Sequence, residues 1–137
     1  MKRSVPTRFR NQRGQSLVET ALMIVVIFLV SFWVFELGWV MYTYTVMADA
    51  ANEGVRYAIV HSGGDVAGTQ AKVTTVAQAS LHNISGMKPP SVTFPDGSAA
   101  PPNRVRVTVT YTFVPWLKGF ITPPTMNTYA EGRMIVP

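Results

Sequence analysis

An uncharged, apolar run is the feature that most constrains how this chain can fold. From Thr20 to Phe35 the sequence reads TALMIVVIFLVSFWVF, with nothing more polar than a threonine and a serine. A membrane core of roughly 30 Å needs about 20 helical residues, because each residue adds about 1.5 Å. We therefore predict a transmembrane helix over residues 15–37, which enters the bilayer near Gln15 and leaves it near Glu36.

Aromatic residues flank the predicted exit from the membrane. Trp33 precedes Glu36, and Trp39, Tyr42 and Tyr44 follow it. Amphipathic rings of this kind gather where the bilayer meets water. We expect Glu36, Trp33 and Trp39 to lie at the far membrane interface.

The net positive charge of the chain lies before the predicted span. The formal net charge is +5, and five cations precede Gln15 with no acid among them: Lys2, Arg3, Arg8, Arg10 and Arg13. Residues 15–137 hold seven cations and seven acids, so they sum to zero. Basic residues before a span resist translocation, so we predict a cytoplasmic leader over residues 1–14 and an exported remainder. The basicity indicates topology and not nucleic-acid binding.

A cleaved secretory signal is the alternative interpretation of this start, because it also combines a basic beginning with an apolar run. The apolar run is longer than the core of a usual signal. The small-x-small triplet Ala48-Asp49-Ala50 lies well past Phe35. We therefore favour a span that is retained.

The helical pattern continues beyond the predicted span. No proline occurs from Met41 to Val60, and apolar residues recur there at spacings of three and four. Ala50, Gly54 and Ala58 form a row of small residues at i+4 spacing. Such a row lets another helix or a sheet approach closely, so we predict that it is a packing surface.

A second helix and a small sheet are predicted in residues 38–137. Asp65 is placed to cap an amphipathic helix that runs to Ile84. The period then changes to two, which predicts strands over residues 91–94, 104–113 and 128–136, the second with one buried and one wet face. The predicted class is α+β: a long N-terminal transmembrane helix that extends into a small exported domain, with a second amphipathic helix and an antiparallel sheet of about three strands.

No residue pattern points to an enzyme. The chain has no cysteine and only two histidines, His61 and His82. It lacks a nucleophile elbow, a His-Glu-x-x-His motif and a phosphate loop. We predict no catalytic residues, no metal, no cofactor and no small-molecule substrate.

Three segments together resemble a known family. Arg13-Gly14-Gln15-Ser16-Leu17-Val18-Glu19 resembles the prepilin-peptidase site of type IV pilin-like proteins. The segment Glu36-Leu37-Gly38 and the run AANEGVRYA over residues 50–58 are similar to the TadE-like family of the tight-adherence (Tad, or Flp) pilus. The likeness covers residues 13–62 closely and the strand near residues 105–113 loosely. One departure is Thr20, where Tad pilins typically have an aromatic residue.

The resemblance implies a minor pilin, or pseudopilin, that does no catalysis and contributes to pilus assembly and adhesion. Prepilin peptidase would cut between Gly14 and Gln15. Glu19 would then pair with the new Gln15 amine of a neighbouring subunit and set the register. The implied partners are the peptidase, other pilin-like subunits and Tad assembly proteins, in the cytoplasmic membrane or in an extracellular pilus. Two rivals remain open: an uncleaved single-pass scaffold of the pilus or secretion machinery, and an exported enzyme or ligand-binding module on a signal anchor.

Overall fold

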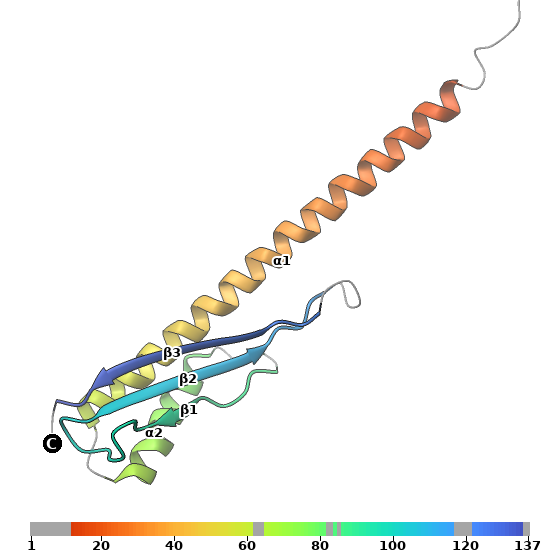
Figure 1. The fold of residues 1–137 in the computed structure, drawn as a ribbon. Helices are drawn as coiled ribbons and strands as arrows, with labels where there is room; N and C mark the ends of the chain where they lie inside the picture. The colour runs from red at the N-terminus through yellow and green to blue at the C-terminus, as the bar shows by residue number, and fades with distance from the viewer. Residues whose placement is uncertain (1–11, 62–64, 82–83, 85, 117–121, 136–137) are drawn as a thin grey trace, which may run out of the picture. The chain divides into compact units, whose positions relative to one another are not determined.

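The computed structural model describes residues 12–61, 65–81, 84, 86–116 and 122–135. The chain divides into two compact units, Met1–Gly38 and Trp39–Pro137. It contains the helices α1 (Gln12–His61) and α2 (Val66–Ala79) and the strands β1 (Ser91–Thr93), β2 (Arg104–Thr112) and β3 (Thr125–Arg133), as drawn in Figure 1. A long apolar N-terminal helix, a second helix and a three-stranded antiparallel sheet confirm the predicted α+β class.

Helix α1 is continuous over 50 residues. It begins at Gln12, three residues before the predicted start at Gln15, so residues 12–14 of the predicted leader are helical. Residues 1–11 lie outside the described part of the chain. A shift of this size is ordinary, because the exact end of a helix depends on the hydrogen bonds of its last turn.

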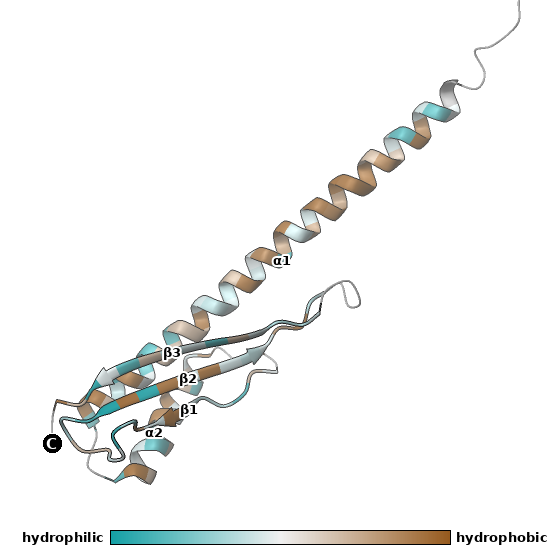
Figure 2. Ribbon diagram, in the orientation of Figure 1, coloured by the Kyte–Doolittle hydropathy of each residue, from teal (hydrophilic) through white to brown (hydrophobic). Residues whose placement is uncertain are grey.

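In the first unit, apolar side chains are exposed on every side of α1. Val25, Val26, Ile27 and Phe28 are four consecutive residues, and each residue is 52–63% exposed. Successive helical residues point about 100° apart, so these four cover the whole circumference. Figure 2 shows the same hydrophobic character along this part of α1. This segment of α1 is long and apolar enough to cross a membrane.

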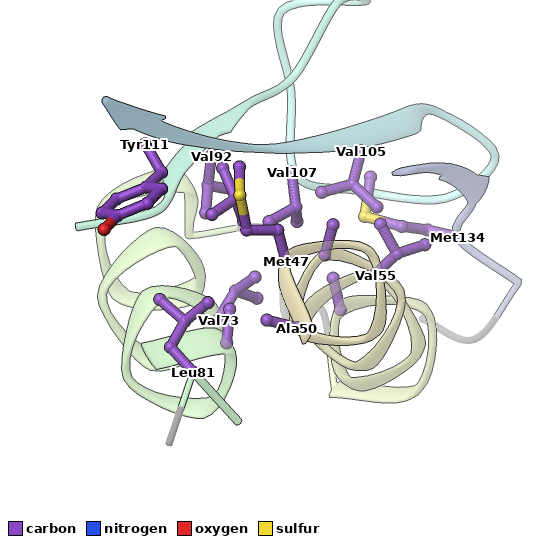
Figure 3. Packing of buried hydrophobic residues seen from close by; sticks show 14 of the residues in the cluster. Met47, Ala50, Val55, Val73, Leu81, Val92, Val105, Val107, Tyr111 and Met134 are labelled. Carbon is purple, nitrogen blue, oxygen red and sulfur yellow. The ribbon is translucent and has the colours of Figure 1, made fainter. Parts of the chain in front are cut away.

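In the second unit, two helices cover one face of the sheet. The strand order is β1-β2-β3, and both pairs are antiparallel. The inner face of β2 and the residue after it is buried: Val105, Val107, Val109, Tyr111 and Phe113. These side chains pack against Met47, Ala50 and Val55 of α1 and against Val73 and Leu81 in and after α2 (Figure 3). The predicted alternation along this strand is confirmed.

Some predicted ends differ from the observed ones. Helix α2 ends at Ala79 and not at Ile84, because the amides of Leu81 and Ile84 bond to carbonyls three residues earlier, as in turns. Strand β1 ends at Thr93, one residue before the predicted end at residue 94. Strand β3 begins at Thr125, three residues before the predicted start, because the Phe113 amide donates to the Pro124 carbonyl and extends the hairpin.

Candidate processing and assembly segment

Gly14 and Gln15 lie in the first turn of α1 and are exposed. The first four backbone N–H groups of a helix have no acceptor within the helix, so this turn is the easiest to unwind. A glycine weakens it further, by about 1 kcal/mol relative to alanine. Apart from its chain neighbours and the backbone of its own helix, no described heavy atom lies within 4 Å of the point where a Gly14 Cβ would stand. The peptide bond between these two residues is therefore accessible from solvent.

Glu19 lies on the same side of α1 as this bond. It stands one turn beyond Gln15, and the two line a shallow open depression together with Gly14, Val18 and Leu22. The Glu19 side chain is exposed. Among the side chains that the structure describes, none forms an ion pair with it. The carboxylate is thus accessible to a cation from outside the chain.

The two hydroxyl groups of the apolar run are satisfied within the helix. Thr20 Oγ1 donates to the Ser16 carbonyl at 2.8 Å, and Ser31 Oγ donates to the Ile27 carbonyl at 2.8 Å. Hydroxyls bonded back in this way need no water. Thr20, which departs from the usual aromatic residue, therefore adds no unsatisfied polar group to the apolar segment.

The residues predicted at the membrane interface are mostly exposed. Trp33 and Trp39 are 51% and 43% exposed, and Glu36 is half-buried. The rings of Trp39 and Tyr42 stack with centroids 5.5 Å apart. Their exposed faces suit the boundary between lipid and water.

The row Ala50, Gly54 and Ala58 faces the core of the second unit. All three residues are buried. A Cβ on Gly54 would lie 3.1 Å from Ala77 Cβ of α2 and 3.3 Å from the methyl groups of Val107 of β2. The small row therefore brings α1 close to both α2 and the sheet within one subunit.

Gly132 is a packing residue that the sequence analysis did not single out. A Cβ at this position of β3 would lie 2.6 Å from Val55 Cγ1 and 2.8 Å from Ile59 Cδ1 of α1. A glycine within a strand often marks such a close approach, and its place inside the predicted strand was the available signal.

A network of charges on the outer face of the sheet was also missed. Arg104 contacts Asp96 at 2.9 Å and Glu131 at 3.2 Å, and Arg106 contacts Glu131 at 2.8 Å. The side-chain hydrogen bond from Arg104 lowers the pKa of Asp96, and that from Arg106 lowers the pKa of Glu131. The hydrogen bond to Asp96 raises the pKa of Arg104. Arg106 also lies 5.2 Å from the centroid of the Tyr129 ring.

Titratable groups elsewhere do not gather into a site. Across residues 12–135, as far as they are described, no three His, Asp or Glu side chains stand close enough to hold a metal ion. The ring of His61 stacks on Tyr57 at 4.3 Å, at the end of α1. His82 lies outside the described residues.

A protein-family model matches part of the chain. The family of TadE-like proteins, which are structural components of pili, matches residues 14–56. Comparisons with curated proteins and with solved structures found no match. The matched segment begins at Gly14 and includes Glu19, Glu36 and the small row as far as Gly54. The resemblance to the TadE-like family that the sequence motifs predict is therefore confirmed over residues 14–56.

Proposed function

We propose that this chain is a minor pilin, or pseudopilin, of a Tad (Flp) type IV-like pilus, and that it contributes to pilus assembly and adhesion. The observation that carries the proposal is the TadE-like match, which begins at Gly14 and runs along a helix with apolar side chains exposed on every side. A helix that is apolar all round needs lipid or other helices around it.

The proposed subunit enters the cytoplasmic membrane once. Residues 15–37 span the bilayer, residues 1–14 stay in the cytoplasm, and residues 38–137 form the exported domain. The continuous α-helical backbone of residues 15–37 and the internal bonds of Thr20 and Ser31 support this placement, because the bilayer core offers no hydrogen-bond partners.

A prepilin peptidase then cuts the bond between Gly14 and Gln15. The accessible first turn supports this step, because only a few weak backbone interactions must be lost before the bond enters an active site. The cut removes the basic leader and creates an amine at Gln15.

Glu19 of one subunit pairs with the Gln15 amine of a neighbour during assembly. The Glu19 carboxylate has no partner of opposite charge among the described side chains of its own chain, and pairing with the amine offsets the cost of placing both charges in apolar surroundings. The apolar surface around Val25 to Phe28 leaves lipid at the same time and packs on other spans.

The test is the N-terminal sequence and intact mass of the chain purified from membranes, with and without co-expressed prepilin peptidase. We expect a chain that begins at Gln15 only when the peptidase is present, and no cleavage in Gly14→Ala. Gly38→Ala is the matched control, because Gly38 is also a helical glycine with no neighbour within 4 Å. Its cleavage should be unchanged. Glu19→Gln should be cut, but its recovery with sheared filaments should fall.

An uncleaved single-pass scaffold is the second candidate. It is favoured by one observation, that the bond between Gly14 and Gln15 lies inside α1. A chain that keeps residues 1–14 in the presence of the peptidase would support the scaffold and remove the amine that Glu19 is proposed to bind.

A further inference from the structure

Two apolar side chains are exposed where β2 leads into the connection to β3. Val114 is 51% exposed and Trp116 is 76% exposed. They alternate with Phe113 and Pro115, which are buried in the second unit. Together they form a small exposed apolar surface, which gains meaning from the other apolar side chains exposed at the same end of the unit.

The direction of β2 places these side chains at one end of the second unit. Gly132 pairs with Val105 and contacts Val55 and Ile59 of α1. Two residues further along β2, Val107 contacts Gly54. Within this unit, β2 therefore runs antiparallel to α1, as Figure 1 also shows. The strand thus leads back toward the residues with which the second unit begins.

The rise per residue in β2 and in α1 shows which part of α1 lies beside the end of β2. Six residues from Val107 to Phe113 span about 20 Å at about 3.3 Å each. The same length along α1 is about 13 residues, which leads from Gly54 back to about Met41. A tilt between strand and helix shortens this by a few residues. Val114 and Trp116 thus lie beside the beginning of the second unit, where Trp39, Met41 and Tyr42 are 43%, 71% and 50% exposed.

This end of the second unit is uncharged along three segments. Residues 39–48, 108–116 and 122–130 contain no Asp, Glu, Lys or Arg. The ion-pair network of Asp96, Arg104, Arg106 and Glu131 lies toward the opposite end of β2. Lys88 is a charged residue near this end of the unit. It directly follows Met87, which forms a β-bridge with Tyr111. A lysine at this place suits anionic phospholipid headgroups.

We propose that Val114 and Trp116 contact the membrane interface beside Trp39 and Tyr42, so that the segment directly after β2 is a second lipid-binding element. The inference rests on the proposed membrane span, because the covalent link from Gly38 to Trp39 then holds this end of the unit at the bilayer. An indole ring at the boundary of lipid and water is stabilised by its apolar body and its N–H group together. Residues 117–121 lie outside the described residues and are not part of the proposed surface.

The test uses the full chain in vesicles of phosphatidylcholine and phosphatidylglycerol, with acyl chains brominated near the headgroup. The chain has three tryptophans. A variant with Trp33→Phe and Trp39→Phe keeps only Trp116. We expect its fluorescence to be blue-shifted and quenched by the brominated lipid at least twofold. Val114→Asp in the same background should shift the emission back to the red and reduce the quenching.

Two further variants and measurements separate the possible failures. A chain that keeps only Trp33 reports on the span itself. If Trp33 is quenched but Trp116 is quenched only by aqueous iodide, the hairpin inference is wrong and the span stands. If neither residue is quenched by the lipid, both are wrong. If Trp116 is shielded from iodide only at high protein-to-lipid ratios, it contacts a second copy of the chain, which also overturns the inference.

Discussion

Gly54 shows how one missing side chain sets the distance between elements. Leucine at this position gains about 0.8–1 kcal/mol of helix propensity but must overlap Ala77 and Val107, which typically costs about 1–3 kcal/mol. The net loss of stability is therefore up to about 2 kcal/mol, and we expect Gly54→Leu to lower the Tm of the full chain in detergent by up to about 8 °C. Ala71→Leu, at an exposed position of α2, is the control and should change the free energy of unfolding by less than about 0.5 kcal/mol. Equal Tm values for the two variants would show that the close approach is not required.

The carboxylates of the outer network make a second residue-scale prediction, on pH. The pKa values of Asp96 and Glu131 are lower in the folded chain than their ordinary values of 3.8 and 4.5. Their contribution to stability is therefore present above those values and is lost as the pH falls through the lower folded ones. We expect the Tm to fall between about pH 5 and pH 3, and less steeply in 1 M salt, because exposed pairs are screened.

Asp96→Asn combined with Glu131→Gln should flatten that pH dependence. Glu53→Gln, at an exposed position of α1, should leave it unchanged. The raised pKa of Arg104 has no effect in this range, because arginine stays charged throughout it. A double variant with the same slope as the parent chain would contradict the assignment to this network.

At the scale of elements, the start of α2 depends on one capping residue. Asp65 accepts hydrogen bonds from the amides of Ala67 and Gly68, at 3.1 Å each. Asp65→Ala should destabilise the chain by about 1 kcal/mol, whereas Asp65→Asn should keep the cap. Gly68→Ala should bring none of the usual gain of alanine over glycine, because its Cβ would overlap the Asp65 carboxylate. Hydrogen exchange of the first α2 amides, together with Tm, measures both effects.

The elements that the sequence predicts well are those with a long, regular period. The continuous apolar pattern of α1 and the alternation from Val105 to Phe113 depend on local sequence alone, and both are confirmed. The Asp65 cap is local too and is confirmed. The early start of β3 and the turn that replaces the end of α2 depend on individual hydrogen bonds. Such bonds cannot be predicted from the spacing of apolar residues. Gly132 and the Asp96–Arg104–Glu131 network depend on strand register, which brings together residues far apart in the chain.

At the scale of the whole molecule, the separation of charge and apolar surface along the chain governs its proposed orientation. Five cations precede the span, and the rest of the chain is neutral in sum. Each cation near the cytoplasmic surface is attracted to anionic lipid by about 1 kcal/mol, which favours the proposed cytoplasmic N-terminus. The proposed exported domain, residues 38–137, carries seven bases and five acids that are scattered along the chain. It therefore offers less resistance to translocation than the five clustered cations of the leader, which have no acid among them.

The absence of cysteine allows a direct test of this orientation. Single cysteines are introduced by Ser4→Cys and Gln78→Cys in the Gly14→Ala background, so that the leader is retained. A membrane-impermeant maleimide should label position 78 in spheroplasts and position 4 only after lysis. Replacement of all five leader cations with glutamine should give a mixture of both patterns, because the bias that sets orientation is then gone. Labelling of position 4 in intact spheroplasts would reverse the proposed topology and place the leader away from the cytoplasm.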